Sequence, residues 1–229
     1  MQANKKMHQL TTLIRQTLES TGNEDNAVPM QAYMKSELPF RGVKAGERKK
    51  IFSQIIKQVP VSTQNEYKRI IRELWDADFR EERYMAVTLA RRYKKFQVLE
   101  MLSLYKMMIQ TGAWWDYVDE LAAHLIGSLL RRYPDEMKMT LRAWIKDDDV
   151  WLRRSAILAQ LQFKSETDAK MLFEFCESRL HETGFWICKA IGWALRAYSK
   201  TEPYAVRRFV DQNKDRMSRV TFKEAVKYI

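Results

Sequence analysis

The sequence repeats itself at a step of about 35 residues, and this repeat limits the possible folds more than any other feature. Its register is marked by Tyr84, Asp119, Arg154 and Lys189, which stand 35 positions apart. The columns that follow hold mostly small or apolar side chains, which let neighbouring helices approach to about 8–10 Å. A repeat of this length is typical of stacked helix pairs, each of which buries its apolar face against its neighbours.

The distribution of glycine, proline and apolar residues predicts helices along the chain. Seven glycines and five prolines fall between long stretches with apolar residues at spacings of three and four. No segment alternates with period two, so we expect no strands. We therefore expect an all-α fold, a HEAT-like helical repeat solenoid (an α-α superhelix), as a single domain over residues 1–229. The expected helices span residues 7–20, 29–36, 46–58, 62–75, 81–93, 96–111, 115–132, 134–146, 150–163, 168–178, 185–198, 203–212 and 218–229.

The charge of the chain indicates a polyanionic partner. Forty Lys and Arg against twenty-nine Asp and Glu give a formal net charge of +11, which makes nucleic acid the leading candidate. Pairs of basic residues recur in successive repeats, and such pairs would follow a phosphate backbone along one side of a curved surface. We expect a monomer that holds double-stranded DNA in a basic concave face.

Several function classes lack their sequence signals. No Gly-rich phosphate loop, dinucleotide-binding fingerprint or nucleophile elbow is present, which disfavours kinases, ATPases, dehydrogenases and serine hydrolases. The three histidines are scattered, and Asp147–Asp149 precedes an apolar helix as a cap would, so we expect no metal and no cofactor. No signal peptide or membrane span is visible, so we expect a cytoplasmic protein with no membrane partner. Cys176 and Cys188 are expected as reduced core thiols.

The stretch from Ala113 to Asp119 concentrates two tryptophans and two carboxylates at the expected start of a helix. Asp116 falls in the first turn, where a carboxylate meets free backbone N–H groups, so we interpret it as a capping residue. Asp119 lies a turn deeper and shares a helix face with Trp115, four positions earlier. Asp119 is therefore the better candidate for chemistry.

A structural interpretation of the same residues stays open. Buried aromatic side chains usually fill a core, and we accept this interpretation for Trp114. For Trp115 and Trp193 the repeat register favours a functional role, because each lies one turn from a register position. Asp119 itself could be an acid that only forms an ion pair with Arg154.

The segment from Trp114 to Asp119 resembles the AlkD-like DNA alkylation repair glycosylases, a family built from HEAT-like repeats. Further motifs occur in the same order, and the resemblance extends from about Pro29 to the end of the chain. These motifs are Tyr33-Met34-Lys35, Ile71-Arg72-Glu73-Leu74-Trp75-Asp76, Trp151-Leu152-x-Arg154 and Lys189-Ala190-Ile191-Gly192-Trp193-x-Leu195-Arg196.

The resemblance implies roles for individual residues. It implies that Asp119 is the catalytic carboxylate and that Trp115 and Trp193 pack beside the damaged nucleotide. It also implies that Arg154 faces the phosphates of that nucleotide and that Tyr33 lies on the DNA face. The full set of expected DNA contacts is Tyr33, Arg154, Lys189, Phe185 and Trp186.

The implied activity is the removal of cationic N-alkylated purines, such as N3-methyladenine and N7-methylguanine, from duplex DNA. The positive charge weakens the glycosidic bond of such a purine, so no general acid is needed. An anion near C1′ would stabilise the oxocarbenium-like transition state. The alternative is a non-catalytic HEAT-repeat scaffold that binds nucleic acid or an acidic protein.

Overall fold

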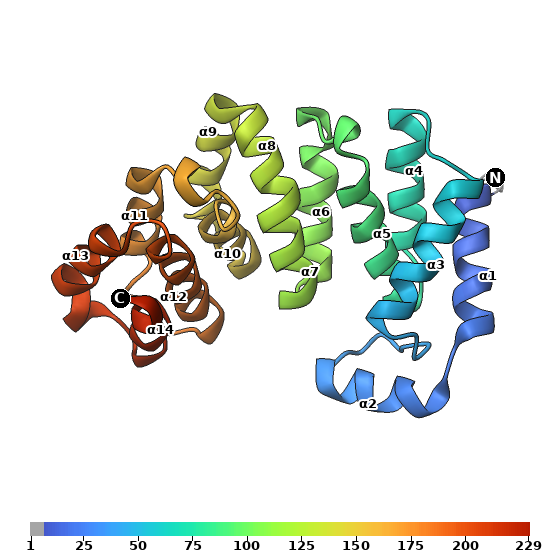
Figure 1. Ribbon diagram of the computed structural model, residues 1–229, viewed down its shortest axis with the longest axis horizontal. Coiled ribbons are helices and arrows are strands. Elements are labelled where there is room, and N and C mark those ends of the chain that lie inside the picture. The colour runs from blue at the N-terminus through green and yellow to red at the C-terminus, as the bar shows by residue number, and fades with distance from the viewer. Residues whose placement is uncertain (1–6) are drawn as a thin grey trace. The chain divides into compact units, whose positions relative to one another are not determined.

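The computed structural model describes residues 7–229, and this part of the chain contains helices and no strands (Figure 1). The prediction of an all-α helical fold is confirmed. The chain divides into two compact units, of which the first ends at Phe96 and the second runs from Gln97 to Ile229. Because of this division, the single domain expected over residues 1–229 stays a prediction, and each unit is described by itself.

The first unit consists of five helices in its described part, which begin and end close to the predicted positions with one exception. Helix α4 begins with a capping box, in which the Thr63 hydroxyl accepts from the Glu66 N–H and the Glu66 carboxylate accepts from the Thr63 N–H. Helices α4 and α5 pack against each other, and α1 packs on α3, α4 and α5. The helices are α1 (Gln9–Thr21), α2 (Glu24–Met34), α3 (Ala45–Gln58), α4 (Gln64–Trp75) and α5 (Arg80–Arg92).

The exception is α2, whose predicted start at Pro29 is wrong. The helix begins one turn and a half earlier, where the Asn23 side chain accepts a hydrogen bond of 3.0 Å from the N–H of Asn26. The acidic side chains of Glu24 and Asp25 in the first turn add a favourable interaction with the helix dipole. Pro29 therefore lies inside the helix, and the polar residues before it act as a cap rather than as a loop.

A buried carboxylate fixes the loop between α2 and α3. Glu81, in the first turn of α5, accepts hydrogen bonds from the backbone N–H groups of Arg41, Gly42 and Val43 at 3.0, 2.9 and 3.1 Å. Gly42 has φ of +82°, and a Cβ there would lie 1.8 Å from the carbonyl oxygen of Asn23, so only glycine fits. The loop is thus tied to the start of α5 on one side and to the start of α2 on the other.

The second unit continues with helices α6 to α14. A π-helical segment, Leu121–Ile126, joins α7 to α8, so residues 115–132 form the continuous helix that the sequence predicts. Two predicted boundaries are wrong: residues 94–101 contain two 3₁₀ turns before α6, and α10 ends at Leu158 instead of Phe163. The helices are α6 (Leu102–Gly112), α7 (Trp115–Glu120), α8 (Gly127–Arg132), α9 (Pro134–Trp144), α10 (Val150–Leu158), α11 (Ala169–Ser178), α12 (Phe185–Ser199), α13 (Pro203–Asn213) and α14 (Arg219–Ala225).

The repeat step of 35 residues is visible in the contacts of the second unit. Four of its side chains form hydrogen bonds with residues 35 positions away, as expected when equivalent positions of successive repeats lie side by side. Helices α12 and α14 lie close together at Gly192, where a Cβ would lie 2.6 Å from the Cβ of Glu224. The four pairs are Arg132 with the Gln97 carbonyl, Arg131 with Glu166, Arg154 with Asp119, and Lys189 with Glu224.

Candidate active site

Asp119 lies at the end of the first full turn of α7, which starts directly after a sharp change of chain direction. Ala113 adopts a left-handed conformation, with φ of 40°, and ends α6. Trp114 then stands at the N-cap of α7 without a side-chain cap, and Asp116 lies in the first turn, where the sequence places it. Asp119 follows one turn later, and its side chain is 11% exposed.

Arg154 of α10 holds the Asp119 carboxylate in a two-pronged contact. Its Nε donates to Oδ1 at 2.7 Å and its Nη2 donates to Oδ2 at 2.9 Å. This parallel arrangement is the strongest geometry available to an arginine and a carboxylate, and it fixes the plane of the carboxylate. The residues that the 35-residue step relates are therefore in direct contact.

Arg154, for which the resemblance implies a position facing DNA phosphates, is almost completely buried. Its side chain is only 3% exposed, and its Nη1 donates to the carbonyl oxygen of Trp186 at 2.6 Å. The guanidinium carbon also lies 5.7 Å from the centre of the Trp186 ring. Arg154 is thus a buried bridge between α7 and α12, because the acid of the preceding repeat and a backbone carbonyl of the following one both attract it.

The same burial affects the acidity of Asp119. Loss of solvent raises the pKa of Asp119, the hydrogen bonds and the charge of Arg154 lower it, and the net shift is upward. The nearby charges of Asp116 and Glu120 add to the upward shift. Asp119 is accordingly an acid that changes its ionisation at a higher pH than an exposed aspartate.

Three tryptophans form a cluster beside Arg154, which the cluster contacts through Trp186. The ring of Trp186 lies 5.3 Å from the rings of both Trp114 and Trp151, and Trp114 and Trp151 are 6.3 Å apart. Phe185 extends the cluster, with its ring 5.1 Å from that of Trp186, and 55% of its surface is exposed. Two neighbouring rings, those of Trp186 and Phe185, therefore extend from the buried guanidinium of Arg154 to the protein surface.

A second charged cluster lies further along α12. The Lys189 amine donates to Oε1 of Glu224 at 2.6 Å, and Arg196 and Lys227 also form ion pairs with this carboxylate. The hydrogen bond from Lys189 is the main cause of a lowered pKa at Glu224. Trp193 stands between Lys189 and Arg196 on α12, so Glu224 fixes the cations on both sides of this tryptophan.

Glu224 is the residue that sequence reasoning missed, although a signal was present. The register of 84, 119, 154 and 189 continues with the same step to 224. The central members of this register are not exposed on the surface. Asp119 and Arg154 are buried because they neutralise each other, and Lys189 is half-buried against Glu224.

The structure brings some of the expected site residues together and leaves others apart. Trp115 is half-buried one turn before Asp119, and Phe185 and Trp186 contact the pair or each other. Trp193 and Lys189 belong to the Glu224 cluster. Tyr33 lies in the first unit, where 77% of its surface is exposed.

Several features of the described residues bear on other kinds of site. Residues 7–229 contain no group of three or more His, Cys, Asp and Glu side chains that could hold a metal ion, and no helix among them is long and apolar enough to cross a membrane.

Asp149 caps α10 by accepting from the N–H of Trp151 at 2.8 Å, which confirms the capping interpretation of the acidic run. Cys176 and Cys188 are buried and unpaired, as predicted.

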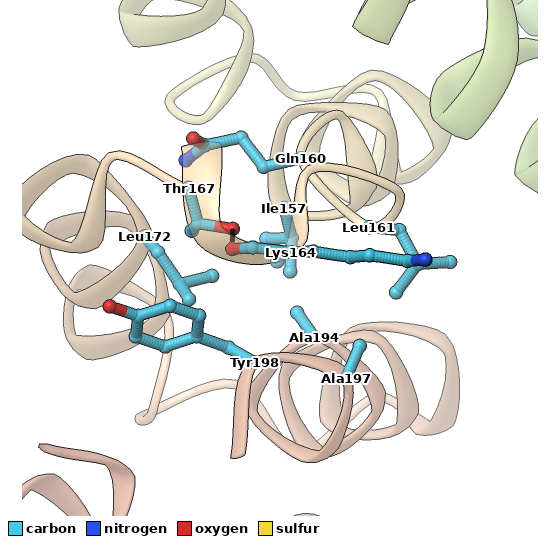
Figure 2. Close-up of a pocket in the computed structure, with 9 residues that line it drawn as sticks. All are labelled: Ile157, Gln160, Leu161, Lys164, Thr167, Leu172, Ala194, Ala197 and Tyr198. Carbon is cyan, nitrogen blue, oxygen red and sulfur yellow. Dashed lines mark hydrogen bonds between the residues drawn. The ribbon is translucent and has the colours of Figure 1, made fainter. Parts of the chain in front are cut away.

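A cavity between α10 and α12 is too small for a substrate. Its volume is about 10 Å³, close to the least that a single water molecule needs. Figure 2 shows Leu172 and Ala194 beside the Tyr198 ring, with the Lys164 amine and the Tyr198 hydroxyl directed to opposite sides.

Comparisons with known proteins bear on the family and the fold of the chain. The profile of a family described as DNA alkylation repair enzyme matches residues 14–229. No curated protein sequence matches the chain.

Three solved structures share the fold. The chain is 29% identical to a predicted DNA alkylation repair enzyme from Enterococcus faecalis, with a TM-score of 0.83 over 91% of this chain and 96% of the other. It is 14% identical to smu.31 from Streptococcus mutans UA159, with a TM-score of 0.66 over 96% and 99% of the two chains. It is 17% identical to AlkD2 from Streptococcus mutans, with a TM-score of 0.60 over 79% and 89% of the two chains.

Proposed function

Because the chain belongs to the family of DNA alkylation repair enzymes, we propose that it is a glycosylase that hydrolyses the N-glycosidic bond of cationic N3- or N7-alkylated purines in duplex DNA. The observation that carries the proposal is the Asp119 carboxylate, oriented by two hydrogen bonds from Arg154 and still 11% exposed. The proposal places the protein in the cytoplasm, as a monomer with the duplex against a basic concave face.

The proposed reaction needs one anion and no acid. The bond between C1′ and the ring nitrogen breaks, and its electron pair neutralises the positive charge of the departing purine. Positive charge then develops on the sugar, where a fixed carboxylate stabilises it most effectively if water is largely excluded. Water adds its oxygen to C1′ and loses a proton to solvent or to Asp119, which leaves an abasic site and the free base.

The neighbours of Asp119 would assist this step in different ways. Arg154 would act as a positioning residue, because its guanidinium is buried and bound on three sides. Trp115 lies one turn before Asp119, and its ring could face the cationic sugar. Trp193, Phe185, Trp186, Lys189 and Tyr33 remain proposed DNA contacts, of which Phe185 and Tyr33 are the most exposed.

The decisive experiment compares release of N7-methylguanine from methylated duplex DNA by the wild-type protein and by Asp119→Asn. Loss of the charge should lower the single-turnover rate by about a hundredfold to a thousandfold, as for other groups that stabilise transition-state charge. The matched control is Asp116→Asn, one turn earlier on the same helix, which should retain excision. Melting curves and duplex affinity of all three proteins should be measured, because Asp119→Asn leaves the buried Arg154 without its counter-ion.

The same assay tests how the substrate is selected. If the positive charge of the base drives its departure, duplex DNA containing uracil, a neutral base, should yield no release under the same conditions. Release of uracil at a rate comparable to that of N7-methylguanine would contradict the charge-based mechanism.

A non-catalytic scaffold is the second candidate, and the two-pronged Asp119–Arg154 contact favours it as well, since such a pair also joins neighbouring repeats. In a scaffold, the wild-type protein and folded Asp119→Asn would release equal amounts of base, or none, while both still bind duplex DNA. Binding alone does not separate the candidates, because the net charge of +11 predicts it in both cases.

A further inference from the structure

The first unit contains a hollow that the proposed chemistry does not use. Its volume is about 230 Å³, and it lies where the end of α2 meets the start of α3 and the middle of α5. Three aromatic residues, Tyr33, Phe40 and Tyr84, and two methionines of α2 line it together with the cations Lys44 and Arg48. No acidic residue lines it.

One wall of the hollow is a fixed aromatic surface. The hydroxyl group of Tyr84 accepts from Nε of Arg80 at 3.2 Å, and the ring of Phe40 lies 6.3 Å from the Tyr84 ring. The guanidinium of Arg48 lies over the Tyr84 ring at 4.3 Å. By contrast, Tyr33 exposes 77% of its surface at the edge of the hollow. Arg48 thus covers the Tyr84 ring, and the ring open to stacking by a planar ligand is that of Tyr33.

The cations make the same hollow selective for an anionic ligand. Nη1 of Arg48 donates to the carbonyl oxygen of Val43 at 2.7 Å, so its guanidinium is held at the rim before any ligand arrives. Lys44 is the N-cap residue of α3, and its side chain is exposed. Two positive charges beside three aromatic rings match a ligand that combines a phosphate with a flat ring system.

The size of the hollow limits that ligand to one ring system. Pockets for drug-sized molecules measure about 300–1,000 Å³, and this one is smaller. The hollow itself is large enough for a single base. The loop that carries Phe40 and leads to Lys44 is fixed by the hydrogen bonds of Glu81, so the site is formed in advance.

We propose that this hollow binds one unpaired nucleotide, with its base stacked on Tyr33 and its phosphate against Lys44 and Arg48. The ligand has two sources, a free mononucleotide or an unpaired nucleotide within a DNA strand. The site belongs to the unit without Asp119, so it does not depend on the proposed excision.

The test is calorimetric titration of the full chain with deoxyadenosine monophosphate at 150 mM salt, with deoxyadenosine and inorganic phosphate as partial ligands. We expect one binding site per chain for deoxyadenosine monophosphate, and much weaker binding of deoxyadenosine alone or of inorganic phosphate alone. Tyr33→Ala and Lys44→Ala should each weaken binding by about fivefold or more, since stacking of one base is worth about 1–3 kcal/mol. Both side chains are exposed, so neither variant should unfold.

The matched control is Tyr204→Ala, because Tyr204 is 84% exposed in the second unit and is followed by Arg207 and Arg208. It should bind the mononucleotide as the wild-type protein does. No saturable binding, an equal loss in Tyr204→Ala, or binding that Tyr33→Ala and Lys44→Ala leave unchanged would overturn the proposal. Tight binding of an acidic tyrosine-containing peptide without mononucleotide binding would overturn it as well.

A second titration identifies the source of the nucleotide. A duplex with one unpaired deoxyadenosine is compared with the fully paired duplex, for the wild-type protein and Tyr33→Ala. A larger effect of Tyr33→Ala on the bulged duplex supports a nucleotide within DNA, and equal effects together with mononucleotide binding support a free nucleotide. The excision assay that compares the wild-type protein with Asp119→Asn does not depend on the outcome of these titrations. A failure of the nucleotide-binding proposal is therefore distinct from a failure of the glycosylase proposal.

Discussion

Both units bury carboxylates near an arginine, but they use them differently. In the first unit, Glu81 accepts three backbone hydrogen bonds, and the adjacent Glu82 binds Nε of Arg41 at 2.9 Å. Both glutamates are almost completely inaccessible, and the groups that they bind belong to one loop. In the second unit, the Asp119–Arg154 pair joins two repeats, retains an open edge and lies beside aromatic side chains.

The difference shows what distinguishes a structural acid from a candidate for chemistry. A buried ion pair is weak evidence of either role, because the cost of desolvation offsets much of the attraction between the charges. Asp119 differs from Glu81 and Glu82 in that part of its side chain is accessible to solvent. Substitutions in the two units should therefore affect different quantities, stability in the first and excision in the second.

The largest expected effect on stability is that of Glu81→Ala. It removes the acceptor of three backbone N–H groups, of which those of Gly42 and Val43 are in buried contacts. Each unsatisfied buried donor costs roughly 1–3 kcal/mol, so the free energy of unfolding should fall by about 3–5 kcal/mol. Urea denaturation measures this loss.

The control for this substitution is Glu19→Ala, which removes an exposed glutamate from α1 of the same unit and should change stability by less than about 0.5 kcal/mol. A similar, small effect of Glu81→Ala would show that the loop does not depend on the carboxylate, and the contrast between the units would disappear.

An intermediate effect is expected for Arg154→Lys, which keeps the charge and loses the two-pronged contact. Stability should fall by about 1–3 kcal/mol, since hydrogen bonds to charged groups are lost. Because Arg154 lowers the pKa of Asp119, its loss should shift that pKa further upward. The ionised form does the proposed work, so excision by the variant should fall more at pH 6 than at pH 8.

Single-turnover rates measured across this pH range are the test. In the wild-type protein, the rate should decline as the pH falls through the raised pKa of Asp119. A variant whose pH profile coincides with that of the wild type would show that Arg154 contributes to stability alone.

The sequence was sufficient to predict the helices and the stack, because both depend on periodic patterns. The apolar spacing of three and four placed α4, α5 and α9 within two residues, and the step of 35 placed Asp119 beside Arg154, as the structure has it. The start of α2 was missed because Pro29 is a stronger local signal than the Asn23 cap, although a cap followed by acidic residues also starts a helix.

The site was only partly predictable, because register fixes neighbours but not burial. It placed Asp119 near Arg154, and the resemblance gave this arginine a role at the phosphates. The structure turns it inward instead, since the Asp119 carboxylate and the Trp186 carbonyl compensate its buried charge. Glu224 was missed because the register ended one repeat too early, and no motif marks a lone glutamate near the end of the chain.

The smallest effect on stability is expected for Glu224→Gln, and its dependence on pH identifies the charge of Glu224 as the cause. The cations around Glu224 lower its pKa, above all through the hydrogen bond from Lys189, so the ionised carboxylate stabilises the fold at neutral pH. This contribution is complete above the usual pKa of a glutamate and is lost as the pH falls through the lowered value. Lys189 and Lys227 are partly exposed, which limits the loss at pH 7 to about 1 kcal/mol. Melting midpoints of the wild type and the variant should therefore differ at pH 7 and converge in acid, whereas a constant difference would assign the effect to packing of α14 on α12 instead of to charge.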